Sequence, residues 1–153
     1  MDRIGRSRIS LLLTALAAAG LGYDAYVHLH LAANYDAVGS TITQGWLFRV
    51  EAAAAIAAVL ALFTSDHRLA WAFAGTVGLG GLVAVVLYRY VDVPSFSPIP
   101  RMYEPIWYAE KTRSAIAEGG VAVVWILREI LRRPVSSVRS RAPLAAQERA
   151  GPG

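Results

Sequence analysis

The clearest chemical signal in this sequence comes from two ionisable residues within an otherwise apolar segment. Asp24 and His28 are four positions apart in residues 9–32, ISLLLTALAAAGLGYDAYVHLHLA. On a helix this spacing places both side chains on one face, about one turn apart. A carboxylate beside an imidazole can relay a proton, bind a metal ion or hold the head of a polar ligand. His30 would point to a different face, so we do not expect His28 and His30 to share one metal ion or one haem.

Other charged residues occur within or beside the remaining apolar segments. A charge in the hydrocarbon costs at least a few kcal/mol, so it usually faces the interior of a bundle, a partner or a watery cavity. We therefore expect a polar cluster in which the side chains of Asp24, His28, Glu51 and Glu118 converge. The further candidates for ligand binding are Arg89, Glu104, Tyr23 and Tyr108.

The composition indicates the environment of these residues. Of the 153 residues, 56% are hydrophobic and 17% are charged, against roughly 45–50% and about 25% in ordinary globular domains. The chain has no cysteine, which excludes disulfides, cysteine-bound zinc and iron–sulfur clusters. It also lacks Gly-x-Ser-x-Gly, His-Glu-x-x-His and a phosphate-binding glycine loop, so no reaction is predicted. We expect the lipid bilayer as partner and no nucleic acid.

Four segments are candidates to cross a membrane, which takes about 20 mostly apolar residues. They run over about 9–32, 45–63, 69–90 and 114–131. The last is the weakest, because it contains Glu118 and Arg128. The connection AANYDAVGSTITQ has no Lys or Arg, whereas both chain ends and the SDHR turn are basic. Because cytoplasmic loops are enriched in Lys and Arg, we predict an all-α, four-span bundle with both termini cytoplasmic, in a bacterial inner membrane.

The segments outside the spans differ in character. Residues 1–8 form a basic cytoplasmic N-terminus before the membrane domain 9–131, and 132–153 form a basic tail expected to be disordered. Residues 91–113 are rich in Pro and aromatic residues and are expected to form an external loop, with a helical turn near Ile106–Lys111. Three Arg before LLLTALAAAG resemble the start of a signal peptide, but apolar character continues to Leu31, which favours a retained span.

Small residues recur in the expected spans and can bring helices close together. The sequence predicts close packing through the pairs Ala74 and Gly78, Gly80 and Ala84, Ala17 and Gly20, and through Gly119, Gly120 and Ala122. The same faces could serve a homo-oligomer or a partner membrane subunit.

Three explanations of the polar cluster are open. In the first, Arg49 and Arg89 neutralise the carboxylates in a structural network. In the second, the cluster binds a small polar or amphipathic ligand, such as a quinone head or a lipid headgroup. In the third, Asp24 and His28 bind a divalent metal ion with one or both of Glu51 and Glu118. We expect the cluster to lie in the outer half of the membrane, and nothing comparable in the inner half.

Four segments carry a resemblance to known proteins: GYDAYVHLHLAANYD, QGWLFRVEA, LYRYVDV and MYEPIWYAEKTRSAIAE. In these the chain resembles a group of small, uncharacterised bacterial integral membrane proteins with four spans, over roughly residues 9–131. The resemblance implies a topology and no established activity. More distantly, the layout is similar to DoxX-type membrane subunits, some of them associated with quinone-linked redox chemistry, which implies a redox or proton-relay subunit as an alternative.

Overall fold

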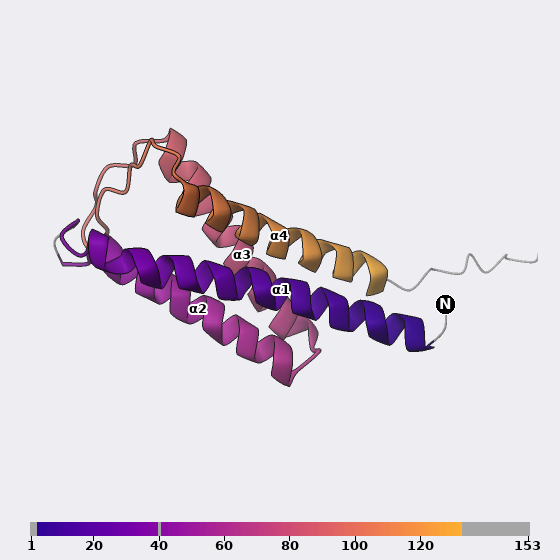
Figure 1. The fold of residues 1–153 in the computed structure, drawn as a ribbon. Coiled ribbons are helices and arrows are strands. Elements are labelled where there is room, and N and C mark those ends of the chain that lie inside the picture. Colours follow the sequence, from indigo (N-terminus) through magenta and orange to yellow (C-terminus); the bar gives the residue numbers. More distant parts are fainter. Residues whose placement is uncertain (1–2, 40, 133–153) are drawn as a thin grey trace, which may run out of the picture.

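The chain folds into four α-helices packed as a bundle (Figure 1). The computed structural model describes residues 3–39 and 41–132. Its elements are α1 (Arg3–Ala32), the 3-10 turn η1 (Ala33–Tyr35), α2 (Gln44–Thr64), α3 (Arg68–Tyr90) and α4 (Ala109–Arg132). α1 and α3 each pack against both α2 and α4, so neighbours in the sequence are neighbours around the bundle. The predicted all-α four-helix bundle is confirmed.

The helix ends differ from the sequence-based boundaries in two places. α1 begins at Arg3, so the helix extends into the basic segment expected as a separate N-terminus. α4 begins at Ala109, later than the turn expected near Ile106–Lys111. The expected disorder of the tail concerns residues that, Arg132 excepted, lie outside the described part of the chain.

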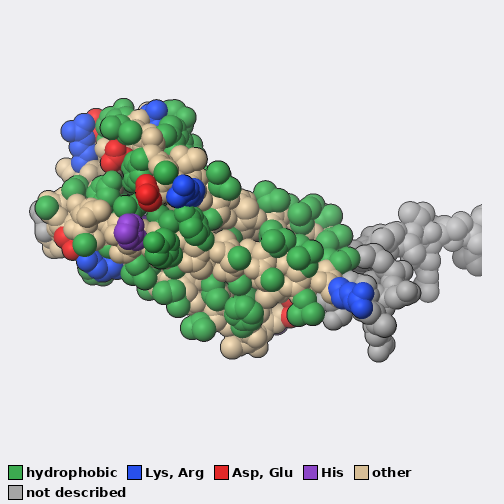
Figure 2. Space-filling view, viewed as in Figure 1, with side chains coloured by type: hydrophobic (Ala, Val, Ile, Leu, Met, Phe, Trp, Pro, Cys, Tyr) green, Lys and Arg blue, Asp and Glu red, His purple; other side chains and the backbone are tan. Residues whose placement is uncertain are grey.

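Three of the described helical segments are long and apolar enough to cross a membrane: Arg8–Tyr35, Gln44–Thr64 and Arg68–Tyr90. At 1.5 Å per residue, α2 and α3 are about 32–35 Å long, which matches a hydrocarbon core of about 30 Å. Figure 2 shows hydrophobic side chains over the middle of the molecule, with charged side chains gathered toward its two ends. These apolar surfaces indicate contact with a lipid bilayer.

Alanine and glycine let the helices approach closely at the centre of the bundle. Ala17, Ala52 and Ala55 are fully buried. A Cβ on Gly20 would lie 2.7 Å from Val121, and one on Gly75 would lie 2.1 Å from the ring of Trp125. Without a hydrophobic drive between helices in lipid, such contacts supply much of the packing.

The predicted role of two other glycines in packing is wrong. A Cβ added to Gly80 or Gly120 would meet nothing within 4 Å. Both glycines are also exposed. Small residues recur on several faces of these helices, and spacing alone does not tell which face meets a neighbour.

A buried arginine joins the α2–α3 turn to α4 at the end of the bundle opposite the α3–α4 loop. Arg128 is only 3% exposed, and its Nη2 donates to Asp66 Oδ1 at 2.6 Å and to the Asp66 carbonyl at 2.8 Å. Its guanidinium lies over the Trp71 ring, 4.4 Å from the centroid. Arg132 also donates to Asp66, at 2.7 Å. The expectation that this half of the bundle holds nothing comparable is therefore wrong.

The Asp66 carboxylate should make stability depend on pH. Partial burial alone would raise its pKa, but the hydrogen bond from Arg128 and the charges of Arg128 and Arg132 hold the pKa below its ordinary value of 3.8. A carboxyl with a lowered pKa stabilises the folded state above its ordinary pKa, and this contribution is lost as the pH falls through the lowered value. We expect Asp66→Asn to lower the unfolding temperature at neutral pH and to remove part of the acid sensitivity below 3.8. An equal loss of stability on acidification in both proteins would contradict this assignment.

Candidate functional site

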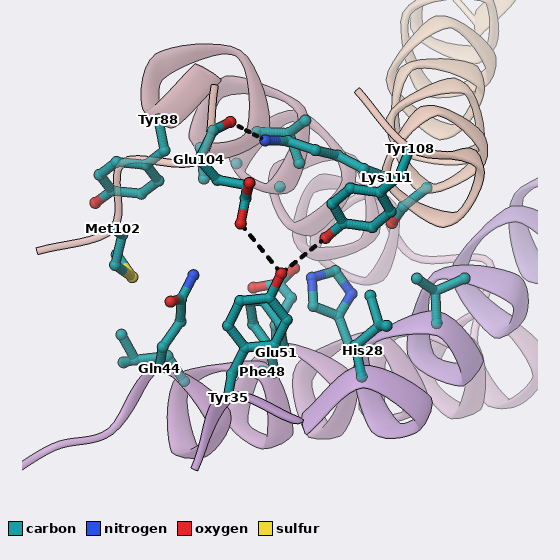
Figure 3. A pocket seen from close by; sticks show the side chains of 18 residues that line it. His28, Tyr35, Gln44, Phe48, Glu51, Tyr88, Met102, Glu104, Tyr108 and Lys111 are labelled. Atoms are coloured by element: carbon teal, nitrogen blue, oxygen red, sulfur yellow. Dashed lines mark hydrogen bonds between the residues drawn. The ribbon is translucent and has the colours of Figure 1, made fainter. Parts of the chain in front are cut away.

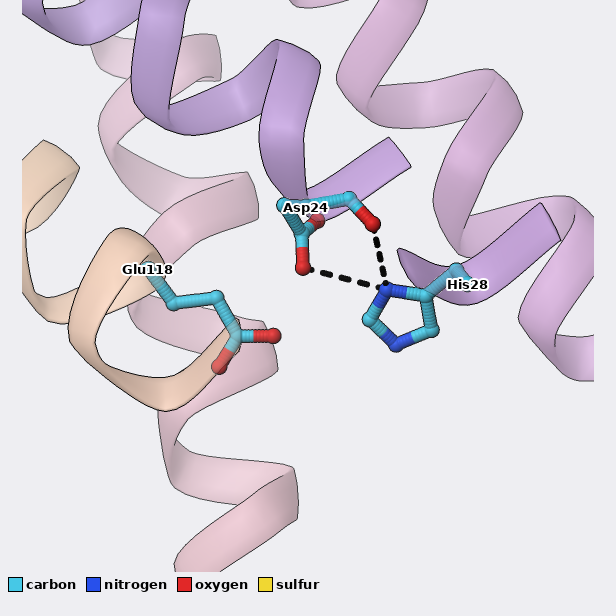
Figure 4. A group of neighbouring side chains, drawn as sticks. All are labelled: Asp24, His28 and Glu118. Carbon is cyan, nitrogen blue, oxygen red and sulfur yellow. Dashed lines mark hydrogen bonds and ion pairs between the residues drawn. The ribbon is translucent and has the colours of Figure 1, made fainter. Parts of the chain in front are cut away.

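Asp24 and His28 on α1 meet Glu118 on α4 in the interior of the bundle (Figure 4). One ligand-type atom of each side chain lies within 4.8 Å of the other two. Asp24 and Glu118 are each only 1% exposed. The structure thus holds a buried polar group of three ionisable side chains from two helices.

The hydrogen bonds of His28 show that its Nδ1 carries a proton. Its Nδ1 lies 3.1 Å from the backbone carbonyl oxygen of Asp24 and 3.0 Å from Asp24 Oδ1. Because a carbonyl and a carboxylate only accept, Nδ1 must be the donor. The other ring nitrogen, Nε2, remains available for a ligand. Such a carboxylate contact also fixes the orientation of the imidazole ring.

The two carboxylates are only partly satisfied by their neighbours. Ser114 Oγ lies 2.8 Å from Asp24 Oδ1 and 3.3 Å from Glu118 Oε1, but its single proton can serve only one of them at a time. Among the described residues, neither Asp24 Oδ2 nor Glu118 Oε2 has a hydrogen-bond partner. A Cβ on Gly81 would lie 2.6 Å from Glu118 Oε1, so the glycine makes room for this carboxylate.

A cavity of about 180 Å³ adjoins this group at the end of the bundle near the α3–α4 loop (Figure 3). Apolar walls come from α1, α2, α3 and the loop, and include Leu31, Phe48, Val85 and Met102. The polar side chains of the lining are those of His28, Tyr35, Gln44, Glu51, Tyr88, Glu104, Tyr108, Lys111 and Ser114. Glu51 Oε1 is buried and has no hydrogen-bond partner in the described part of the chain. The cavity thus combines apolar walls with converging polar groups.

Hydrogen bonds hold the loop across one side of the cavity. The Glu104 N–H donates to the carbonyl of Tyr88 at 3.0 Å, which fixes the loop to the end of α3. The Tyr35 hydroxyl lies 3.2 Å from Glu104 Oε2 and 3.3 Å from the Tyr108 hydroxyl. Lys111 donates to the Glu104 carbonyl. Burial raises the pKa of Tyr108, with Glu104 and Glu110 adding to the rise, so this hydroxyl stays protonated at neutral pH.

Some of the remaining candidate residues line the cavity, and others lie outside it. Glu51, Glu104 and Tyr108 line the cavity together with His28. Arg89 and Tyr23 are not part of the lining. The Arg89 guanidinium lies over the Tyr90 ring, and Tyr23 packs against Tyr26.

The observed ion pairs of the described residues do not support the explanation in which Arg49 and Arg89 neutralise the buried carboxylates. Arg49 donates to both oxygens of Asp36, at 2.5 and 2.8 Å. Within residues 3–39 and 41–132, neither Arg49 nor Arg89 pairs with Asp24, Glu51 or Glu118. Arg49 binds Asp36 instead because the chain reverses at η1, which brings Asp36 beside the start of α2.

Four residues that were not among the candidates contribute to the site: Tyr35, Lys111, Ser114 and Gly81. The contribution of Ser114 could have been predicted from the sequence, since Ser114 lies four positions before Glu118 and so on the same helix face. Tyr35 and Lys111 flank the apolar segments and had no comparable signal. Gly81 is one of several glycines in α3, and nothing in the sequence indicates that it is the glycine that contacts Glu118.

Comparison with known proteins adds no family to these observations. No protein-family model matches the chain, and neither does any curated protein or solved structure. The resemblance to small bacterial four-span proteins and to DoxX-type subunits therefore has no support from a family match. What the structure does support is the four-helix fold with three membrane-length helices.

Proposed function

We propose that this protein is a four-span membrane protein that binds a small amphipathic molecule in the cavity between its helices. The observation that carries the proposal is the cavity itself, with apolar walls on several helices and the buried oxygen of Glu51 lacking a partner among the described residues. Ligand sites typically combine apolar walls with a few polar groups that orient the ligand.

The exposed surface of α4 supports a fourth span. All exposed residues between positions 115 and 131 are apolar: Ile116, Gly120, Val123, Ile126, Leu127, Ile130 and Leu131. Of the three charges in this segment, Glu118 and Arg128 are buried inside the bundle, and Glu129 is half-buried. Charged side chains in membrane helices usually face the bundle interior in this way. The distribution of Arg favours cytoplasmic termini in a bacterial inner membrane, with the cavity toward the outer side.

The size and position of the cavity narrow the class of ligand. A cavity of about 180 Å³ compares with the roughly 150 Å³ that accommodates one benzene ring in an engineered protein. It therefore suits one ring or headgroup, with an apolar remainder outside. Gly80 lines the cavity and is also exposed, so the cavity reaches the lipid-facing surface beside α3. A quinone head and a lipid headgroup both have this combination of a polar head and an apolar tail.

Filling the cavity should weaken binding. We expect a short-chain quinone or a short-chain phospholipid to raise the unfolding temperature of the detergent-solubilised protein. Gly80→Leu should reduce this gain, because Gly80 lines the cavity and the free space around its Cβ leaves room for a larger side chain beside the bound ligand. Thermal unfolding with and without each ligand measures the effect and separates the two ligand sources.

Gly120→Leu is the matched control, because Gly120 also has free space around it and does not line the cavity. It should keep the ligand response of the unmodified protein. Ligand binding in this cavity is excluded if neither ligand stabilises the unmodified protein, or if Gly80→Leu responds as strongly as Gly120→Leu.

A further inference from the structure

We infer that Asp24, His28 and Glu118 form a binding site for one divalent transition-metal cation beside the cavity. The inference does not depend on the proposed amphipathic ligand, because Asp24 and Glu118 are not part of the cavity lining, although His28 belongs to both sites. It follows from the charge of the group, the unpartnered oxygens and the kinds of donor atom present.

The charge of the group favours a divalent cation. When both carboxylates are ionised and the imidazole is neutral, the group carries two negative charges, which one divalent cation would neutralise. Uncompensated charge in a low-dielectric interior costs several kcal/mol per ion. Among the described residues, no Lys or Arg pairs with Asp24 or Glu118, and the basic side chain that contacts Asp24 is that of His28.

The carboxylate oxygens that lack a hydrogen-bond partner are a second indication of a bound cation. Asp24 and Glu118 are each 1% exposed, and each leaves one carboxylate oxygen without a partner in the described part of the chain. The great majority of buried polar atoms have a hydrogen-bond partner or a bound ion. Figure 4 shows the Glu118 carboxylate directed toward the side chains of Asp24 and His28. The absence of a side chain at Gly81 keeps Glu118 in this place.

The donor set narrows the type of metal. It offers two carboxylates and one imidazole, with no sulfur ligand in a chain that lacks cysteine. Imidazole favours zinc or iron, and carboxylates also suit manganese, so Zn²⁺, Fe²⁺ and Mn²⁺ fit better than Cu⁺ or Ca²⁺.

Metal analysis of the purified full chain tests the site. We expect the detergent-solubilised protein, dialysed against Zn²⁺ or Mn²⁺, to retain about one ion per chain and to gain thermal stability. Glu118→Gln should weaken the affinity by at least about tenfold, since it replaces a charged ligand with a neutral one of the same size. Glu110→Gln, on the same helix but outside the group, should bind like the unmodified protein.

A second variant keeps the test independent of any folding defect in Glu118→Gln. Gly81→Ala removes no ligand but places a Cβ 2.6 Å from Glu118 Oε1, so it should also lower the affinity. Gly120→Ala adds a methyl group in free space and should not. Less than about a tenth of an ion per unmodified chain, or equal affinity in Gly81→Ala and Gly120→Ala, would overturn the inference. The first result would mean that the carboxylates are balanced by protons instead.

Discussion

Replacement of Arg128 by alanine is expected to lower the free energy of unfolding by about 3 kcal/mol. Arg128 is 3% exposed and donates to Asp66 and Glu129. Hydrogen bonds to charged groups contribute about 1.5–3 kcal/mol, and a cation–π contact such as that with Trp71 adds about 0.5–2 kcal/mol. The loss should weaken the attachment of the end of α4 to the α2–α3 turn, where Arg132 still donates to Asp66. Unfolding in mixed micelles with increasing SDS measures the change.

Arg132→Ala provides the matched control for this result. Arg132 donates to the same carboxylate, but its side chain is 42% exposed. Exposed ion pairs contribute about 0.2–1 kcal/mol, so the control should lose much less stability than Arg128→Ala. Similar losses in the two variants would show that burial of Arg128 and its stacking on Trp71 do not matter for stability.

Gly75→Ala is expected to have the second-largest effect, a loss of about 2 kcal/mol. The added Cβ would lie 2.1 Å from Trp125 Cδ2 and 2.3 Å from Cε3, well inside van der Waals contact. The ring of Trp125 is rigid, so α3 and α4 would have to move apart. Overpacking of this kind usually costs about 1–3 kcal/mol. The same unfolding measurement in mixed micelles tests it.

Gly80→Ala should change stability in the opposite direction. Gly80 lies on the same helix, and its added Cβ would meet nothing within 4 Å. Alanine is favoured over glycine within a helix by about 0.5–1 kcal/mol, so this variant should be slightly more stable. If both variants lose stability equally, the contact of Gly75 with Trp125 is not the cause.

Part of the candidate site could be predicted because two of its residues are close together in the sequence. Asp24 and His28 are four residues apart on one helix, and helical periodicity alone places them together. The convergence of Glu118 with them was expected from the cost of a charge in lipid, which forces an intramembrane carboxylate toward the interior. The partners of these groups were harder to predict. In one of the three open explanations Arg49 neutralises a buried carboxylate, but it pairs with Asp36 in the reversal between α1 and α2.

The ion pairs of the buried Arg128 at the other end of the bundle were missed for a related reason. Arg128 counted only as a charge that weakened the fourth segment, and Asp66 as part of a polar turn. The two residues are 62 positions apart in the sequence. Their contact follows from the antiparallel packing of α3 and α4, which brings the start of α3 beside the end of α4. No pattern within either segment contains this relation.

The sequence by itself determined the all-α class and the three membrane-length helices, because length, hydropathy and the positions of proline act within each segment. It also determined that Asp24 and His28 share one face. Only the tertiary structure decided which glycines are close contacts, which charges pair, and where a cavity remains. Gly75 and Gly80 illustrate this difference: both are glycines of α3, yet one faces Trp125 and the other faces open space. Such outcomes depend on the rotation and spacing of neighbouring helices, and packing between distant segments sets both.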